Sequence, residues 1–120
     1  TDYNPSAERF LAENVQLNSG REIPFVRAGW AEETPGLGEF DLIIGSDVLY
    51  ERGLVADLAG FLDRHGKAAC TVVIVDPGRG NSGPFNRHMA EHGFQATTFD
   101  PPRVELPDAD WGGRCVEYHR

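Results

Sequence analysis

The stretch "FDLIIGSDVLYE" (Phe40–Glu51) decides how this sequence folds. Its first part, Phe40–Ser46, is a continuous apolar run after a loop rich in glycine and proline, which is typical of a strand buried on both faces. Polar side chains follow at once, beginning with Ser46 and Asp47. Because open parallel sheets bind ligands beyond the carboxyl ends of their strands, the stretch predicts a buried strand that leads into a functional loop.

Helix and strand patterns alternate on the carboxyl side of this stretch. Apolar residues at helical spacing predict a helix over Glu51–Arg64, with Gly66 as its stop. The apolar run Ala69–Asp76 predicts a second buried strand. The remaining predicted elements are a short helix over Pro84–His92 and two strands over Phe94–Phe99 and Arg114–His119, which are expected to pair antiparallel.

A helix is also predicted on the amino side. Asn4 is a good cap and Pro5 suits a first helical turn, and "NSG" (Asn18–Gly20) is a typical helix end. A short strand is predicted over Pro24–Ala28. Strands that alternate with helices in this way predict an α/β sheet layered by helices.

Composition restricts the classes of partner. The chain has 120 residues, enough for one domain, and its formal net charge of −8 argues against a nucleic-acid backbone as the main partner. No apolar run is long enough to cross a membrane, and no cysteine or histidine spacing indicates a metal site. Cys70 and Cys115 are expected to be buried free thiols, consistent with a cytoplasmic protein.

A second candidate site is the loop "IVDPGRGNSGPF" (Ile74–Phe85), in which Gly78, Gly80 and Gly83 spell G-x-G-x-x-G. With Asp100 about 20 residues further on, this pattern suggests a dinucleotide-binding loop. Against it, Pro84 predicts a helix that starts after the last glycine, and no further strand–helix unit follows Asp100. A polar loop is therefore favoured, with Arg79 available for an acidic partner.

The side chains at the predicted strand ends have both a functional and a plain interpretation. Asp2 can accept hydrogen bonds from both hydroxyls of a ribose, or it can be a solvated turn residue. Trp30 can stack on a purine or cover the edge of the core. Asp47 can face a cation or cap the next helix, and Tyr50 can orient an amine or pack at the sheet edge.

These pieces together resemble a known family. "TDYNPSAERFLAENVQLN" (Thr1–Asn18) is similar to the end of the second strand and the next helix of seven-strand, class I S-adenosylmethionine-dependent methyltransferases. "FDLIIGSDVLYE" resembles the family's fourth strand followed by the D-x-x-Y motif of the branch that includes protein-lysine methyltransferases. Asp47 and Tyr50 match that motif.

The resemblance implies a Rossmann-like methyltransferase fold, S-adenosyl-L-methionine as cofactor and a role for each candidate residue. Asp2 would hold the cofactor ribose, while Trp30 and Ala31 would border the adenine. Ser46 and Asp47 would lie near the methionine end, with Tyr50 at the substrate channel and Asp47 and Tyr50 as the catalytic pair. The acceptor would be a protein side chain such as lysine, although a small molecule stays open.

One departure from the family concerns the amino end. The family's strand order is 3-2-1-4-5-7-6, and its first strand and glycine-rich loop have no counterpart in this sequence. Residues 1–120 are therefore expected to be the C-terminal part of a single methyltransferase domain, and the isolated chain is expected to be inactive.

Two other functions stay open. One is a non-catalytic, methyltransferase-like module that binds a partner protein. The other is a fragment of a dinucleotide-binding oxidoreductase, suggested by the glycine loop. The sequence indicates neither the oligomeric state nor the identity of the acceptor.

Overall fold

A computed structural model describes residues 1–99 and 113–120 of the chain. The chain divides into two compact units, Thr1–Leu37 and Gly38–Arg120, and each is described by itself. The predicted acidic partner of the glycine loop, Asp100, lies outside the described residues.

The second unit is built on a four-stranded sheet with the order β1-β2-β4-β3. Its strands are β1 (Phe40–Ser46), β2 (Gly66–Asp76), β3 (Gln95–Phe99) and β4 (Arg114–His119). β1 and β2 pair parallel, whereas β4 pairs antiparallel with both β2 and β3. This order is the one that the resemblance implies for the fourth, fifth, seventh and sixth strands, so the predicted sheet and its antiparallel final strands are confirmed.

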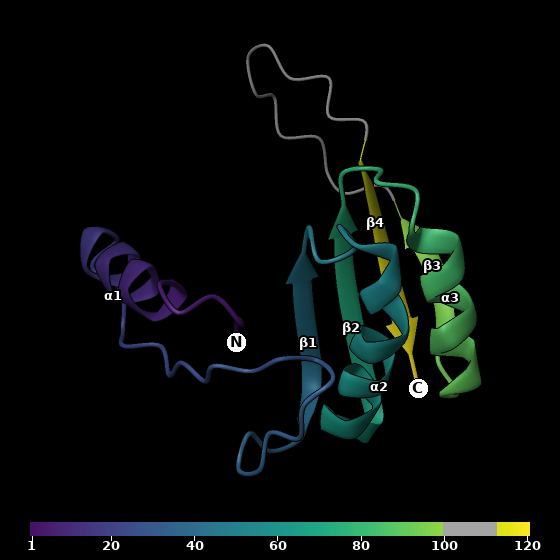
Figure 1. Cartoon of the computed structure of the whole chain (residues 1–120), viewed down its shortest axis with the longest axis horizontal. Coiled ribbons are helices and arrows are strands. Elements are labelled where there is room, and N and C mark those ends of the chain that lie inside the picture. The colour runs from purple at the N-terminus through teal and green to yellow at the C-terminus, as the bar shows by residue number, and fades with distance from the viewer. Residues whose placement is uncertain (100–112) are drawn as a thin grey trace. The chain divides into compact units, whose positions relative to one another are not determined.

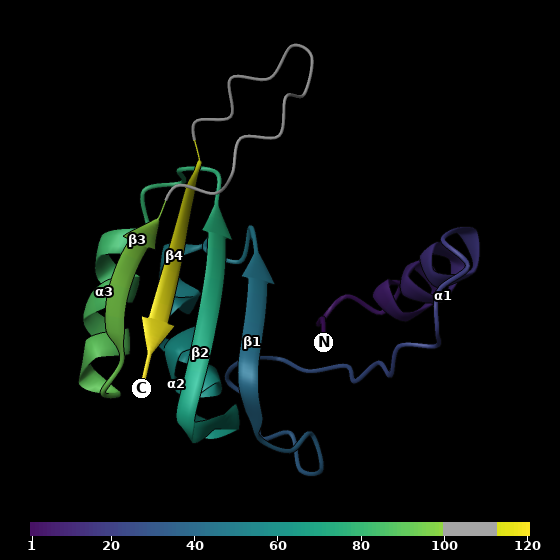
Figure 2. The ribbon, with the colours of Figure 1, turned by 180° about the vertical axis from the view of Figure 1, so that it is seen from behind.

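Two helices pack against the sheet of the second unit. They are α2 (Val55–His65), which follows the 3-10 turn η1 (Arg52–Leu54), and α3 (Ser82–Glu91). Both lie in front of the sheet in Figure 1 and behind it in Figure 2. The helix predicted over Glu51–Arg64 is thus two elements, and its predicted stop at Gly66 is confirmed because the backbone there is extended.

The core lies between this helix layer and the sheet. Alternate residues of β2 point toward the helices, as the period of a strand requires, and Val72 and Ile74 are almost fully buried. On the helix side of this core, α3 contributes the fully buried Phe85 and Met89. Both predicted free thiols are confirmed as buried, and burial raises the pKa of Cys70 and of Cys115 above the usual range of a thiol.

Tyr118 of β4 is linked to α3 by a hydrogen bond from its phenolic hydroxyl. The side chain is 1% exposed, and its hydroxyl donates a 2.6 Å hydrogen bond to Asn86 Oδ1. Burial, with the nearby charge of Asp76 as a second cause, raises the pKa of Tyr118 well above that of a free tyrosine, so the hydroxyl stays a donor.

Tyr118→Phe is expected to lower the free energy of unfolding by about 1 kcal/mol, the net value of one such hydrogen bond. The loss stays modest because Asn86 is exposed and can turn to water. Urea denaturation of the full-length protein measures it. An unchanged midpoint would mean that the bond does not stabilise the fold, and a loss above about 3 kcal/mol would mean that the ring itself has moved.

The prediction that Phe40–Ser46 is buried on both faces is wrong. Leu42 is 59% and Ile44 76% exposed. These side chains share a face with Thr71 and Val73 of β2 by register, and that face is opposite to α2 and α3. Among the described residues β1 pairs only with β2, so it is an edge strand with apolar side chains in water.

The first unit holds α1 (Ala7–Leu17) and a parallel bridge between Asp2 and Arg27. Asn4 accepts a hydrogen bond from the Ser6 amide, as its predicted capping role requires, although the helix begins at Ala7. The helix end at Asn18–Gly20 is confirmed by the 2.9 Å bond from the Gly20 amide to the Val15 carbonyl. The strand predicted over Pro24–Ala28 is wrong beyond the single bridge at Arg27.

Two predicted boundaries on the carboxyl side are also corrected. The helix expected to start at Pro84 begins at Ser82, so Gly83 and Pro84 lie in its first turn. Proline is tolerated there because the first amides of a helix have no partner within the helix. β2 starts at Gly66 rather than Ala69. No helix among the described residues is long and apolar enough to span a membrane.

Candidate functional site

The candidate site of the second unit lies where β1 and β2 end side by side. Ser46 pairs with Val75 in register, and the Asp47 amide donates a 2.8 Å hydrogen bond to the Val75 carbonyl. Asp47 then takes the left-handed conformation, with φ of 53°. Aspartate is one of the few residues that tolerate this conformation, and here it turns the chain out of the sheet directly after the strand.

The Asp47 carboxylate holds a cation from the glycine loop. Arg79 donates from Nε to Oδ1 at 2.5 Å and from Nη2 to Oδ2 at 2.6 Å, which is the bidentate geometry of a guanidinium on a carboxylate. The two residues are 32 positions apart in sequence, yet Asp47 directly follows β1 and Arg79 lies in the loop that follows β2, its parallel neighbour. The prediction that Asp47 faces a cation is thus met, but by Arg79, and Asp47 does not cap α2, whose first residue is Val55.

A second contact fixes the same loop. The Asn81 side-chain amide donates a 2.7 Å hydrogen bond to the Leu49 carbonyl, and Leu49 itself is 1% exposed. Sequence reasoning expected Arg79 to be available for an acidic partner without naming Asp47 as that partner, and it missed Asn81. The signal was that "PGRGN" follows a strand predicted to be buried, so that it had to reach the same sheet edge as Asp47.

The ion pair keeps Asp47 charged. The hydrogen bond from Arg79 is the main reason that the pKa of Asp47 lies below the usual range of an aspartate. The same contact raises the pKa of Arg79, and the charge of Asp76 adds to this rise. Asp47 is therefore a carboxylate at any physiological pH, and it loses its charge only in acid below its ordinary pKa.

Asp76, the last residue of β2, is a second carboxylate near this edge. It is 2% exposed, and its Oδ2 accepts a 3.1 Å hydrogen bond from the Ser82 hydroxyl. Its Oδ1 has no hydrogen-bond partner among the described residues.

Tyr50 completes the D-x-x-Y segment and is 55% exposed, next to the buried Leu49. Its surroundings are those of a surface aromatic residue rather than of a residue packed into the sheet edge. The two candidate catalytic residues, Asp47 and Tyr50, therefore belong to one exposed segment held by Leu49.

In the first unit, Asp2 has an exposed carboxylate. Its Oδ1 accepts a 2.7 Å hydrogen bond from the Asn4 amide, which is the turn geometry that the plain interpretation of Asp2 described. Asp2 also borders an open groove of about 480 Å³. The groove is lined by Thr1, Asp2, Asn4, Ala7, Phe10, Leu11, Asn14 and Phe25.

Trp30 and Ala31 lie in a turn that the Glu32 amide closes on the Gly29 carbonyl at 3.2 Å. Trp30 is partly buried and Ala31 is exposed. The turn follows Ala28, whose amide donates to the Asp2 carbonyl at 3.2 Å, so Asp2 and the Trp30 turn end neighbouring parallel segments.

A parallel pair of strands extended by two antiparallel strands in the order observed here defines a methyltransferase-type α/β fold. The sequence profile of a family described as lysine methyltransferase matches residues 1–92 of the 120. The chain therefore belongs to that family, and the resemblance to class I S-adenosylmethionine-dependent methyltransferases is confirmed.

Solved structures with the same fold are distant in sequence. A precorrin-6y C5,15-methyltransferase from Geobacter metallireducens is 14% identical, with a TM-score of 0.73 over 98% of this chain and 65% of its own. Magnesium protoporphyrin IX methyltransferase from Synechocystis, with bound S-adenosylmethionine, is 16% identical with a TM-score of 0.67, over 98% of this chain and 56% of its own. A putative O-methyltransferase from Nostoc punctiforme is 10% identical with a TM-score of 0.69, over 99% of this chain and 42% of its own.

The chain thus spans less than two thirds of the length of these structures. A comparison with curated proteins finds no significant match. The sheet order argues against the dinucleotide-binding interpretation of the glycine loop. In a dinucleotide-binding unit, the helix after the glycine loop connects two neighbouring parallel strands. Here α3 connects β2 to β3, and β4 lies between these two strands.

Proposed function

We propose that the full-length protein is an S-adenosylmethionine-dependent methyltransferase that acts on a protein side chain such as lysine. The observation that carries the acceptor class is the Asp47 carboxylate, which binds a cation at the end of β1. An amine acceptor is a cation at neutral pH and needs such a partner. The family's own description supports the same acceptor.

The candidate cofactor-binding residues fit S-adenosylmethionine by their chemistry. Asp2 offers an exposed carboxylate suited to ribose hydroxyls, and Trp30 offers a partly exposed aromatic ring suited to a purine face. Ala31 and Ser46 are small enough to border the adenine and the methionine end. When bound, the cofactor supplies an electrophilic methyl group on a sulfonium.

The acceptor's part of the reaction follows from the amine. The new N–CH3 bond forms as the S–CH3 bond breaks, the sulfur leaves as the neutral thioether of S-adenosylhomocysteine, and the amine must have released a proton to solvent beforehand. Asp47 would hold the arriving ammonium and Tyr50 would orient the amine through its hydroxyl. Positioning in line with the S–CH3 bond is the main requirement of such a displacement.

We also propose that residues 1–120 form the C-terminal part of a single methyltransferase domain. The support is that β1 has no further strand partner among the described residues, and that Leu42 and Ile44 are exposed on the sheet face opposite to α2 and α3. The buried thiols Cys70 and Cys115 support a reducing, cytoplasmic location.

The test is methyl transfer by the purified full-length protein from S-adenosylmethionine with a radiolabelled methyl group. Label recovered as methyl-lysine after hydrolysis of acceptor proteins from a lysate is expected. Label found only in small molecules would refute the protein acceptor. Absence of label in any fraction would refute the enzyme and favour the non-catalytic binding module.

A further inference from the structure

Arg79 occupies the carboxylate that the proposed function assigns to the methyl acceptor. Its guanidinium uses both oxygens of Asp47, at 2.5 and 2.6 Å, and so leaves the acceptor's cation no equivalent position on that carboxylate. A lysine ammonium donates hydrogen bonds to the same kind of partner. Arg79 therefore holds Asp47 in the way that a cationic acceptor would.

The contact is built to be replaced rather than to be permanent. The Arg79 side chain is 46% and the Asp47 side chain 44% exposed, so that water and salt screen their attraction. A buried pair would resist exchange far more strongly, because separating it would leave a charge in a dry environment.

The loop lets the side chain move while its base stays in place. Gly78 and Gly80 flank Arg79 with φ of 98° and 83°, and a Cβ on either glycine would meet no atom within 4 Å. Asn81 anchors the end of the loop on the Leu49 carbonyl at 2.7 Å. The loop can thus release the Arg79 side chain without leaving the D-x-x-Y segment.

The guanidinium of Arg79 also interacts electrostatically with a second carboxylate, that of Asp76. Asp76 is buried, one of its oxygens has no hydrogen-bond partner among the described residues, and its charge already acts on Arg79. The charge of Asp76 therefore still favours the cationic form of Arg79 when another group occupies Asp47.

We propose that Arg79 is a specificity-determining residue that competes with the methyl acceptor for Asp47, so that only an acceptor with its own cation displaces it. The proposal rests on the proposed function for the identity of the acceptor. A neutral acceptor cannot replace the guanidinium on Asp47 and meets a closed site. The acceptor class is thereby restricted to amines that arrive as cations.

The experiment measures binding, which does not depend on methyl transfer. Nα-acetyl-lysine amide is titrated into the full-length protein, and the Asp47 carboxyl carbon is followed by NMR. Arg79→Gln is expected to tighten binding about tenfold, because it removes a competing state that dominates the free protein. Nα-acetyl-norleucine amide, which has no charge and cannot displace the guanidinium, is expected to bind the wild type poorly and to gain affinity in Arg79→Gln, whose site stays open. Arg79→Lys, which keeps the competing cation, is expected to return affinity toward that of the wild type.

Lys67→Gln is the matched control. Lys67 also donates to an aspartate of β1, Asp41, at 2.8 Å, but at the opposite end of the strand, and the substitution changes the net charge equally. Unchanged or weaker lysine binding in Arg79→Gln would overturn the proposal, and so would an equal gain in Lys67→Gln. A protein that methylates nothing while Arg79→Gln still binds lysine more tightly would refute the proposed function alone.

Discussion

Asp47→Asn in the full-length protein is expected to lower the rate of methyl transfer by at least about 100-fold, the usual effect of removing a group that positions or deprotonates a reacting amine. Asparagine keeps the shape of the side chain and tolerates the left-handed φ of 53°. It loses the charge that holds a cation, and one of its two acceptor oxygens becomes a donor. The rate with saturating cofactor measures the effect, and the free energy of unfolding is expected to change little.

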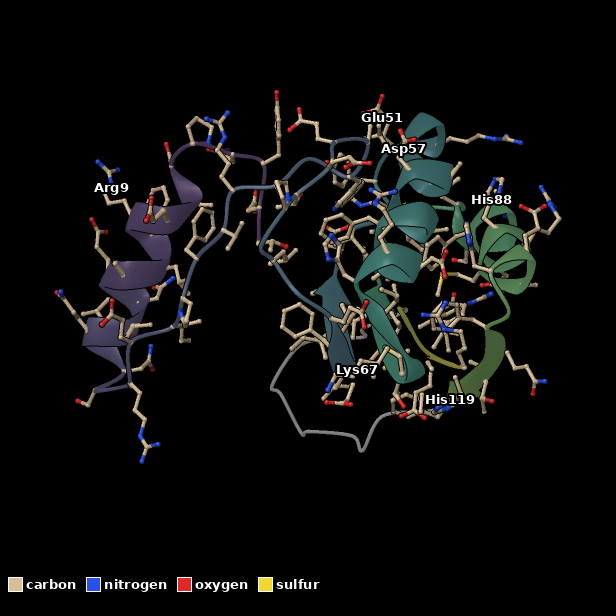
Figure 3. The ribbon with its side chains drawn as sticks, turned by 90° about the horizontal axis from the view of Figure 1, so that it is seen from below. Arg9, Glu51, Asp57, Lys67, His88 and His119 are labelled. Carbon is tan, nitrogen blue, oxygen red and sulfur yellow. The ribbon has the colours of Figure 1, made fainter. Side chains whose placement is uncertain are left out.

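Asp41→Asn is the control for this substitution. Asp41 lies in β1, the strand that leads to Asp47, and accepts a 2.8 Å hydrogen bond from Lys67 of β2, which is labelled in Figure 3. Its pKa is lowered by that bond, as the pKa of Asp47 is by Arg79. Normal turnover in Asp41→Asn is expected. Equal turnover in both variants would refute the assignment of Asp47.

Phe85→Ala is expected to be the most destabilising single change, with a loss of about 3–5 kcal/mol in the free energy of unfolding. The ring is fully buried and meets the edge of Tyr118 at a centroid distance of 5.3 Å. Its removal takes away apolar contact and leaves a cavity between α3 and β4. Urea denaturation measures the loss.

Arg87→Ala tests whether the loss of stability comes from removing the buried Phe85 ring or from any alanine substitution in α3. Arg87 lies two positions further along α3 and is exposed, and its substitution is expected to change the free energy of unfolding by no more than about 0.5 kcal/mol. Similar losses in the two variants would mean that α3 itself, and not the buried ring, is sensitive to alanine.

The strands of the second unit could be predicted closely because clear turn signals bound them, whereas the strand predicted over Pro24–Ala28 was wrong. Phe40–Ser46 and Arg114–His119 have their predicted bounds. The start of α3 could not be predicted, because glycine and proline in the first turn of a helix look the same in sequence as the end of a loop. The exposure of one face of β1 could not be predicted either, because an apolar run in a sequence does not show which other elements cover it.

The candidate site was predicted only in part for a related reason. Asp47 and Tyr50 could be selected since they follow a strand at the edge where ligands bind. The partnership of Asp47 with Arg79 depends on the register that sets Ser46 beside Val75, which no local pattern contains. Residues 32 positions apart were therefore assigned to separate features, a functional loop and a polar loop.

The open edge of β1 also affects how the protein behaves at high concentration. Its outer backbone groups, which pair with no other strand in residues 1–99 and 113–120, can template the addition of a strand from another molecule, and the exposed Leu42 and Ile44 add apolar contact. Such strand addition is the first step of ordered aggregation. The ion pair of Asp41 with Lys67 near the start of the strand has no net charge, so it adds little repulsion against such stacking. Preparations in which this edge stays uncovered are therefore expected to lose solubility as the protein concentration rises.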